Sequence, residues 1–272
     1  MAKITVFICL LLLGIPDAAA VIHSLLYFYT ASSGIPNFPS YVSVGLVDDV
    51  QISYCDSMIN KNIPKQDWMN KVSSEHPRYW EEETQTCWIK QKTLKVNLET
   101  AKQRFNQTGG VHVYQQMYGC EWDSETGEVK GYDHQGYDGE DLIILDSETQ
   151  SWIAPTPQAV ITTNKWNNDK DAVEHEKFYL TQTCAEWLQM YLGYGRSSLM
   201  RTDLPSVSFL PKTSSSPVSC HARGFSQTEL RCSGGKIRGE GFMMVLGRGI
   251  LPNNDGTFSN ELGHRSVLFF CS

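Results

Sequence analysis

The chain has 272 residues, with 23 lysines and arginines against 30 aspartates and glutamates, for a formal charge of −7 at pH 7. This negative balance argues against nucleic acid and anionic membrane surfaces as principal partners, because both are themselves negatively charged. The length is sufficient for one large domain or two smaller ones, each with its own hydrophobic core.

Residues 1–20 have the pattern of a secretory signal peptide. Lys3 supplies the positive start, residues 4–15 are apolar, and Ala18 to Ala20 form a small-residue cleavage site. The apolar run is too short to cross a bilayer, so we expect a mature chain that begins at Val21. Cys9 would leave with the signal peptide, so an odd number of the eight cysteines in the sequence would remain. At least one of these cysteines therefore has no partner in the chain. No CxxC pair is present, so a zinc site is not expected.

Strand-like segments open the mature chain. Residues 24–31 are rich in aromatic side chains, which favour β-structure. Residues 41–47 and 50–55 flank Asp48-Asp49, an acidic pair of the kind that joins the two strands of a hairpin. We therefore predict an antiparallel set of strands in this part of the chain.

A long helix is predicted next. After Pro77, apolar residues recur every three or four positions as far as Phe105, with lysine and glutamate on the other side. Gly109-Gly110 is a plausible terminator. The sequon Asn106-Gln107-Thr108 follows the helix directly and predicts a glycan at Asn106 on an exposed turn.

The same arrangement then repeats. Residues 111–122, 128–133, 141–146 and 151–155 read as strands, and a helical region is predicted from about Gln158 to Leu192, ended by Gly193 and Gly195. Strands followed by a helix, twice over, indicate an α+β fold with an antiparallel sheet.

The acidic, glycine-rich segment 131–146, "GYDHQGYDGEDLIILD", admits two interpretations. An EF-hand calcium loop needs oxygen ligands at alternate positions, glycine at the sixth and glutamate at the twelfth. Counted from Asp133 the twelfth residue is Ile144, and counted from Asp138 the sixth is Ile143, so neither frame fits. We predict a turn between antiparallel strands, and no metal site.

Several motifs carry a family resemblance: "HSLLYFYTA", "VGLVDDVQ", "RYWEEET", "QRFNQTGG", "MYGCEWD", "YDGED", "KWNND" and "TCAEWLQMYLGYG". In this order and spacing, residues 21–202 resemble an MHC class I heavy chain, of bony-fish type. The resemblance implies an eight-stranded antiparallel sheet under two long helices, followed by an immunoglobulin-like domain. The implied domains are 21–110 and 111–202, the two halves of the platform, and 203–272, a truncated immunoglobulin-like domain after a Pro/Ser-rich joint.

The resemblance also assigns roles to single residues. It implies a disulfide between Cys120 and Cys184, which pins the second helix to the sheet. A groove that holds a free peptide by both ends needs hydroxyls and acceptors for an ammonium group, and cations or donors for a carboxylate. The residues at the family's N-terminal peptide positions are Tyr27, Tyr79, Tyr179 and Tyr191. Those at the C-terminal positions are Arg104, Thr162, Lys165 and Trp166, and Cys87, Leu142 and Tyr118 line the groove.

Some of these residues have other interpretations. Tyrosines in strands commonly pack across the sheet, Trp166 could fill the space between helix and sheet, and Lys165 could be a solvated charge. Cys87 could be an unpaired thiol that shapes a peptide pocket, or a small buried hydrophobe. Cys55 and Cys232 have no assigned partner.

The last segment departs from the family. Cys220 matches the first immunoglobulin-type cysteine and could pair with Cys271, but residues 226–249 lack both the strand tryptophan and the acidic loop that engages the T-cell co-receptor. Residues 230–236, read one base out of register, can encode the missing tryptophan strand, so we hypothesise a local frameshift. The chain stops at Ser272 without a final strand, stalk or membrane helix, so we expect this domain not to fold.

The function implied is that of a binding protein without an enzymatic activity or cofactor. It would bind short peptides and present them to T cells, with beta-2-microglobulin, peptide and T-cell receptor as partners. The alternatives are a soluble or non-functional product, or a class I-like protein with non-peptide cargo. A secreted hydrolase is disfavoured because no GxSxG or HExxH motif is present. The expected location is the secretory pathway, with the chain either secreted or retained in the endoplasmic reticulum.

Overall fold

The structure is a computed structural model. It describes residues 21–199 in full and, between residues 206 and 271, the backbone of seven strands. The predicted signal peptide lies outside the described residues. Two units can therefore be considered separately: an α+β platform and a β segment.

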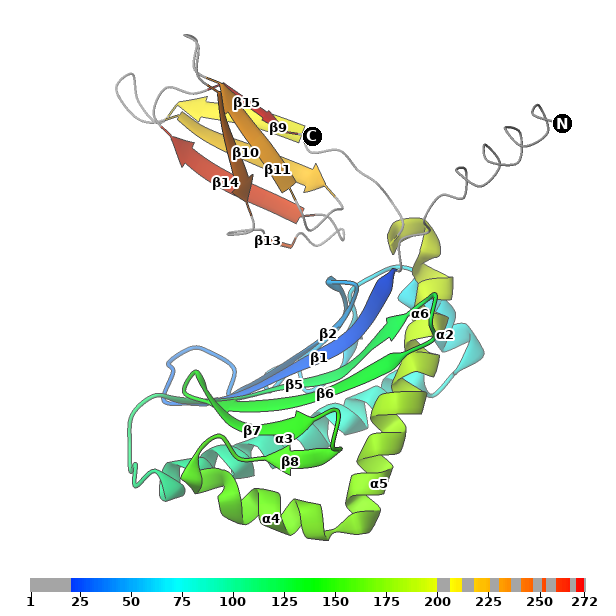
Figure 1. The fold of residues 1–272 in the computed structure, drawn as a ribbon, viewed down its shortest axis with the longest axis vertical. Helices are drawn as coiled ribbons and strands as arrows, with labels where there is room; N and C mark the ends of the chain where they lie inside the picture. The colour runs from blue at the N-terminus through cyan, green and yellow to red at the C-terminus, as the bar shows by residue number, and fades with distance from the viewer. Residues whose placement is uncertain are drawn as a thin grey trace, which may run out of the picture.

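The floor of the platform is a single antiparallel sheet of eight strands (Figure 1) in the order β4-β3-β2-β1-β5-β6-β7-β8. The first half contributes β1 (Ile22–Ser33), β2 (Tyr41–Val47), β3 (Val50–Asp56) and β4 (Ile63–Pro64). The second contributes β5 (His112–Asp123), β6 (Val129–Tyr137), β7 (Glu140–Asp146) and β8 (Ser151–Ile153). The two halves join where β1 pairs with β5 along its whole length, so the predicted repeat is confirmed.

Two-residue turns set the register of one hairpin in each half, β2–β3 and β6–β7. Val47 pairs with Val50 across Asp48-Asp49, and Tyr137 pairs with Glu140 across Asp138-Gly139. All four turn residues have positive φ, as the mirror-image turns that suit the twist of a hairpin require. The acidic segment 131–146 is therefore a strand, a turn and a strand, as predicted.

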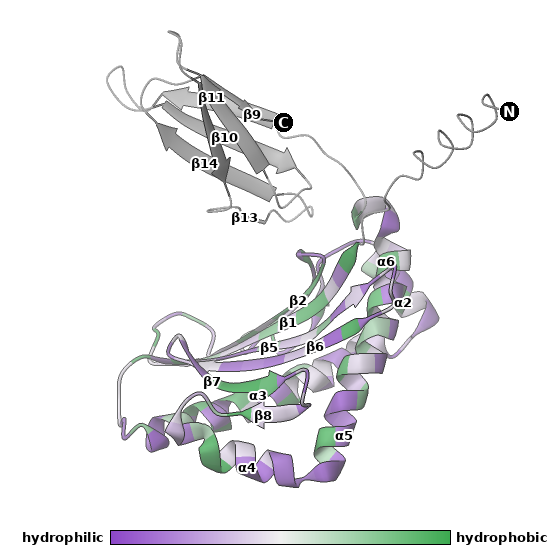
Figure 2. Cartoon of the chain, viewed as in Figure 1, coloured by the Kyte–Doolittle hydropathy of each residue, from purple (hydrophilic) through white to green (hydrophobic). Residues whose placement is uncertain are grey.

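Helices cover one face of the sheet. α2 (Met69–Glu75) and the long α3 (Tyr79–Arg104) belong to the first half. The second half contributes the 3-10 turn η1 (Pro157–Ala159), α4 (Val160–Asn168), α5 (Lys170–Phe178), the π-helical turn η2 (Tyr179–Thr183) and α6 (Cys184–Leu199). Hydrophobic and hydrophilic residues follow one another along these helices (Figure 2), as expected for helices with one buried side.

The second helical region differs from its prediction at its end. The two glycines at 193 and 195 were expected to terminate it, but α6 continues through both to Leu199. A Cβ at Gly195 would stand 2.9 Å from the ring of Trp68. Gly195 therefore lets α6 pack closely against the segment before α2, and its role is close approach rather than termination.

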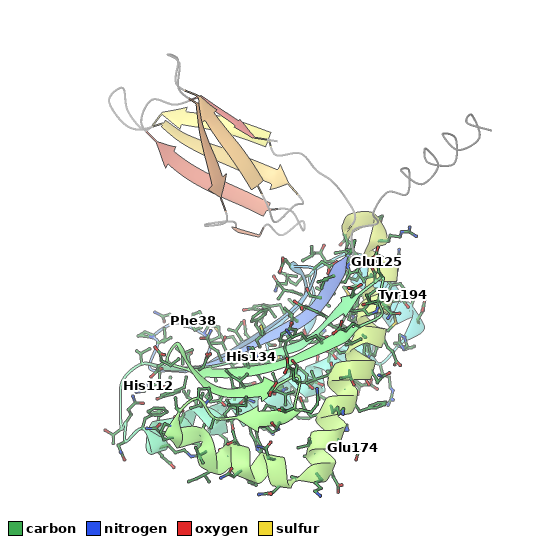
Figure 3. All side chains as sticks on the ribbon, in the orientation of Figure 1. Phe38, His112, Glu125, His134, Glu174 and Tyr194 are labelled. Carbon is green, nitrogen blue, oxygen red and sulfur yellow. A yellow bond between two sulfur atoms is a disulfide. The ribbon has the colours of Figure 1, made fainter. Side chains whose placement is uncertain are left out.

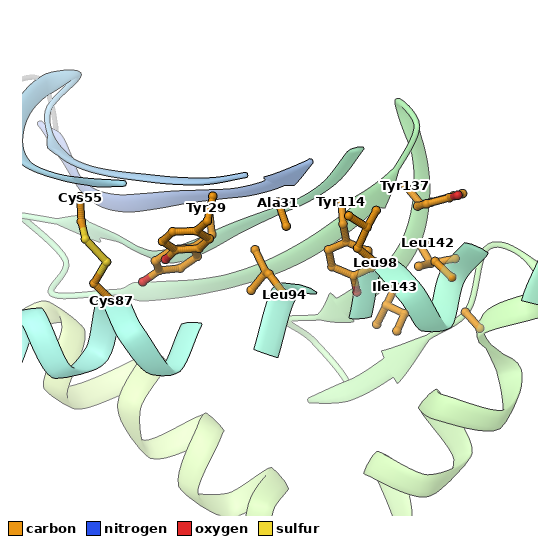
Figure 4. Close-up of a cluster of buried hydrophobic side chains, with 13 residues drawn as sticks. Tyr29, Ala31, Cys55, Cys87, Leu94, Leu98, Tyr114, Tyr137, Leu142 and Ile143 are labelled. Atoms are coloured by element: carbon orange, nitrogen blue, oxygen red, sulfur yellow. A yellow bond between two sulfur atoms is a disulfide. The ribbon is translucent and has the colours of Figure 1, made fainter. Parts of the chain in front are cut away.

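The core lies between the helices and the sheet. One cluster, shown in Figure 4, lies under α3 and includes Tyr29, Ala31, Tyr41, Leu94 and Leu98. The other lies under α2 and α6 and includes Leu25, Ile52, Met69, Val72 and Leu188. Burial of such side chains contributes about 1.5–3 kcal/mol each, so both helical layers are fixed firmly to the floor.

The predicted disulfide between Cys120 of β5 and Cys184 of α6 is present, with a Cα–Cα distance of 6.1 Å. None of the helices in the described part of the chain is long and apolar enough to span a bilayer.

The β segment has strands β9 (Ser206–Pro211), β10 (Val218–Phe225), β11 (Leu230–Gly235), β12 (Gly241–Leu246), β13 (Leu251–Pro252), β14 (Phe258–His264) and β15 (Leu268–Cys271). They form sheets ordered β13-β14-β10-β9 and β12-β11-β15. The first has the connectivity of the four-stranded sheet of an immunoglobulin domain. The backbone of this segment is a partial immunoglobulin-like arrangement, as the resemblance implied, and the expectation that the domain does not fold stays a prediction. The proposed Cys220–Cys271 pairing lies outside the described side chains.

Candidate functional site

Four tyrosines converge at one end of the space between the helices. Tyr27 lies on the floor strand β1, Tyr79 begins α3, and Tyr191 lies on α6. The hydroxyl oxygens of Tyr79 and Tyr191 are 2.7 Å apart, and Tyr191 also interacts with Tyr27. Tyr179, at the start of η2, stacks on Tyr118 of β5 with 5.3 Å between ring centroids. The structure therefore brings together the four tyrosines predicted at this end, with Tyr118 beside them.

A carboxyl group that the sequence analysis missed faces the same cluster. Glu83 follows Tyr79 by four residues on α3, so the two side chains lie on one face of the helix. Burial raises the pKa of Glu83 to about 7, with a smaller contribution from Glu82. Asn62 donates a hydrogen bond from Nδ2 to Oε2 of Glu83 at 3.3 Å. The spacing from Tyr79 was the signal available in the sequence.

This end of the site is suited to a cationic group. Burial raises the pKa of Tyr27 and of Tyr79, so both hydroxyls stay protonated and can donate or accept hydrogen bonds. An ammonium group placed among them would gain hydroxyl acceptors and would also favour the ionised form of Glu83.

At the other end, Arg104 connects the two helical layers. Its Nη1 donates to Oγ1 of Thr162 at 2.6 Å and to the backbone carbonyl of Gln158 at 3.0 Å, so the guanidinium of α3 reaches the start of α4. A small pocket beneath it is lined by Tyr114, Leu142 and Trp166 among others. The end of the site therefore combines a cation, a hydroxyl donor and an apolar pocket.

Three of the four residues predicted to hold the peptide C-terminus line one pocket, and the fourth does not. Arg104, Thr162 and Trp166 line the same pocket, and Leu142, predicted as groove-lining, lies on its floor and is 7% exposed. Lys165 lies on α4 beside them but is exposed and does not line the pocket. The ring of Trp166 packs edge-on against Trp152, with 4.9 Å between centroids.

Cys87 requires a correction. It was interpreted either as an unpaired thiol in the groove or as a small buried hydrophobe, and Cys55 had no assigned partner. The structure joins the two in a disulfide, with a Cα–Cα distance of 6.6 Å (Figure 4). Cys87 is 3% exposed, because its side chain leads from α3 down to Cys55 on β3. It cannot serve as a free thiol for a ligand.

Other predicted features are also placed by the structure. Asn106 is exposed just after α3, and its glycosylation stays a prediction. Within residues 21–199, no group of three or more histidines, cysteines, aspartates or glutamates could hold a metal ion.

These features define an elongated groove on a sheet, bordered by two helical layers, with hydroxyl and carboxyl groups at one end and a guanidinium at the other. Comparison with known protein families identifies the class of protein to which this groove belongs. The family model for class I histocompatibility antigen, domains alpha 1 and 2, matches residues 21–199. The chain belongs to the class I histocompatibility antigen family.

Individual relatives agree with this assignment. The H-2 class I histocompatibility antigen, K-K alpha chain, of Mus musculus is 39% identical over 235 residues, covering 82% of this chain and 60% of the relative. The F10 alpha chain of Gallus gallus is 35% identical over 256 residues, covering 92% and 72%. Major histocompatibility complex class I-related protein 1 of Mus musculus is 35% identical over 244 residues, covering 88% and 70%. The chain thus spans 60% of the length of the first relative and somewhat more of the others.

Proposed function

We propose that this chain binds short peptides in its groove by both ends and presents them to T cells as a class I heavy chain. The observation that carries the proposal is the chemical asymmetry of the groove. Tyr27, Tyr79, Tyr191 and Glu83 suit a peptide ammonium, and Arg104 with Thr162 suits a carboxylate. The two groups occupy opposite ends of α3, which begins at Tyr79 and ends at Arg104.

Arg104 gives the carboxylate end a particular character. Its guanidinium can bind a carboxylate through two parallel hydrogen bonds, which a single hydroxyl cannot do. In the groove as it stands, one nitrogen of that guanidinium is shared between Thr162 and Gln158, so a peptide carboxylate would join or replace these acceptors.

The proposed partners are beta-2-microglobulin, a short peptide and a T-cell receptor. The underside of the sheet is the surface available to a second subunit, because the helices cover the other face. The proposed location is the secretory pathway. A co-receptor contact is not part of the proposal, because the acidic loop is missing from the sequence.

A second candidate is a class I-like protein with cargo other than peptide. The chain is 35% identical both to class I-related protein 1 of Mus musculus and to the chicken alpha chain, so similarity by itself does not choose between the two candidates. The test is to co-express the chain with beta-2-microglobulin, purify the complex, elute it with acid and analyse the eluate by mass spectrometry. Short peptides with a shared C-terminal anchor support peptide presentation. An eluate of small molecules or lipids without peptides would overturn it in favour of the second candidate.

A further inference from the structure

A second pocket lies along the groove between its two ends. Its volume is about 230 Å³, and it is lined from the floor, from α3 and from α5. The groups proposed to hold the ends of a peptide leave it free for a side chain. Its chemistry is set by three charged residues: Lys90, Asp133 and Glu176.

Asp133, on the floor strand β6, is 3% exposed. Gln116 donates from Nε2 to its two carboxylate oxygens at 2.8 and 2.9 Å, and Gln135 donates to the same oxygens at 3.2 and 3.4 Å. None of the ion pairs within residues 21–199 includes Asp133. Its carboxylate is therefore hydrogen-bonded by neutral amides and forms no ion pair within these residues, although Lys90 lines the same pocket and is hydrogen-bonded to the same Gln116.

Glu176, on α5, faces the pocket from the opposite side. Its carboxylate interacts with the hydroxyl of Tyr118, but its Oε1 is buried and has no hydrogen-bond partner. A buried acceptor without a donor is unfavourable, and more so when it belongs to a charged group. This atom is therefore a place where a ligand donor would be favoured.

Lys90, on α3, is the one cation that lines this pocket. Its Nζ donates to Oε1 of Gln116 at 3.3 Å and lies 4.7 and 4.8 Å from the ring centroids of Tyr29 and Tyr118. These contacts hold the ammonium against the two aromatic faces. The pocket thus contains two carboxyl groups and one ammonium that already has partners.

We propose that this central pocket selects a basic side chain, arginine above lysine, at one internal position of the bound peptide. The inference rests on the proposed function and specifies its ligand. A guanidinium presents five donors in a plane and can bridge a carboxylate on the floor and one on the helix, whereas an ammonium is a point charge. An acidic side chain would meet two like charges, and an apolar one would leave Oε1 of Glu176 unpaired.

The test uses the full chain co-expressed with beta-2-microglobulin. Peptides of one length with free ends are synthesised with arginine, lysine, glutamine, leucine or glutamate at each internal position in turn. Their competition with a labelled peptide is measured by fluorescence anisotropy. We expect one internal position at which arginine binds at least about 10-fold more tightly than glutamine, and glutamate most weakly.

Three variants locate the effect. Asp133→Asn and Glu176→Gln keep the side-chain shapes, and each should reduce the preference for arginine over glutamine severalfold. Glu174→Gln removes a charge from an exposed position of the same helix (Figure 3) and should leave the preference intact. Thermal unfolding of each complex confirms that the variants are folded, and Glu176→Gln, at a partly buried position, remains informative if Asp133→Asn is not.

The outcomes separate the two proposals. Peptides that bind through their ends without a preference for arginine at any internal position overturn this inference alone. So does a preference that is unchanged in both Asp133→Asn and Glu176→Gln. If no peptide of any composition competes, the proposed function fails, and this inference fails with it.

Discussion

At the scale of single residues, Asp133 makes the free energy of unfolding of the platform depend on pH. Burial raises the pKa of Asp133 to about 7; Glu176 acts in the same direction, and Lys90, Gln116 and Gln135 oppose it. An unfolded aspartate titrates near 3.9, so between these values the folded chain binds more protons than the unfolded chain. Stability contributed by this group is therefore lost as the pH rises from about 4 to about 7.

The variant Asp133→Asn removes this titration. We expect the stability of the variant relative to the unmodified chain to increase by about 3–4 kcal/mol between pH 4 and pH 7.5, whatever their difference at pH 4. Chemical unfolding of the peptide-free protein at several pH values measures it. Parallel curves for the two proteins across this range would show that Asp133 does not titrate in it.

His112 should have the opposite dependence. Its Nδ1 lies 2.7 Å from Oδ2 of Asp138 and its Nε2 lies 2.8 Å from the carbonyl oxygen of Gly109. Both ring nitrogens face acceptors, so only the doubly protonated ring satisfies both, and the hydrogen bond to Asp138 and then that to Gly109 raise the pKa of His112. The stability that it contributes is fully present below its unfolded pKa of about 6.5 and is lost as the pH rises through the folded pKa.

Measuring the titration of the His112 ring by NMR should give a pKa above 6.5, the usual value for histidine. The destabilisation caused by His112→Gln should be largest near pH 5.5 and should shrink above the measured pKa. A pKa at or below 6.5 would contradict this account. Figure 3 shows His112 at the far end of the platform from Tyr194.

Residues were predictable where a motif fixed their position in the chain. The tyrosines at 27, 79, 179 and 191 stand in segments that matched a known pattern, and the structure brings them together. Glu83, Asp133 and Glu176 were not predicted, because their chemistry depends on burial and on which charges face them across the groove. Only the four-residue spacing from Tyr79 separates the partly buried Glu83 from the exposed Glu81 and Glu82 beside it.

At the scale of elements, both helical layers are covalently fixed to the floor. The disulfide between Cys55 and Cys87 ties α3 to β3, and the one between Cys120 and Cys184 ties α6 to β5. The first joins residues 32 apart in sequence and the second residues 64 apart. In the chain-entropy model such cross-links stabilise by about 3.5 and about 4 kcal/mol.

The double variant Cys55→Ala, Cys87→Ala removes the first cross-link without leaving a single thiol. We expect it to lower the free energy of unfolding by about 2–4 kcal/mol, with Cys120–Cys184 still intact. Denaturant unfolding followed by tryptophan fluorescence measures the change. If the unmodified protein is denatured without a reducing agent, alkylation of Cys55 and Cys87 would contradict the pairing directly.

Helices and strands were predicted best where the spacing of apolar residues and the residue types of the adjoining turn indicated the same structure. The hairpins at Asp48-Asp49 and Asp138-Gly139 could be predicted because short polar turns separate strand-like runs. The end of α6 could not, since whether Gly195 terminates a helix or admits a neighbouring side chain depends on Trp68, far away in the sequence. The pairing of Cys87 depends in the same way on the distance from α3 to β3.

At the scale of the whole molecule, the two halves repeat even in their polar contacts. In the first, Asp48 accepts from the backbone N–H of Ser24 and lies 2.7 Å from Nδ1 of His23. In the second, Asp138 has the same relation to Val113 and His112. The sequence repeat was visible in the order of strands and helix. The antiparallel β1–β5 pairing that joins the halves is a long-range contact, and it makes one continuous groove of them.

A groove built from both halves should hold a peptide by both of its ends. Acetylating the peptide ammonium or amidating the carboxylate should each weaken binding by about 10-fold or more, since hydrogen bonds to charged groups contribute about 1.5–3 kcal/mol. Glu83→Gln should reduce the effect of acetylation but leave that of amidation, and Arg104→Ala should do the reverse. Anisotropy titrations of the free, the acetylated and the amidated peptide against the unmodified chain and the two variants measure these effects.

The pattern across this set is more informative than any single loss. A variant that only distorts the groove would weaken all three peptides alike, whereas a lost end contact makes the variant indifferent to modification of that end alone. If the ratio of the affinities for the free and the amidated peptide were the same in Arg104→Ala as in the unmodified chain, Arg104 would serve only to connect α3 with Thr162. The peptide carboxylate would then have to be held elsewhere, and Lys165, exposed on the adjacent turn of α4, is the nearest predicted cation available to it.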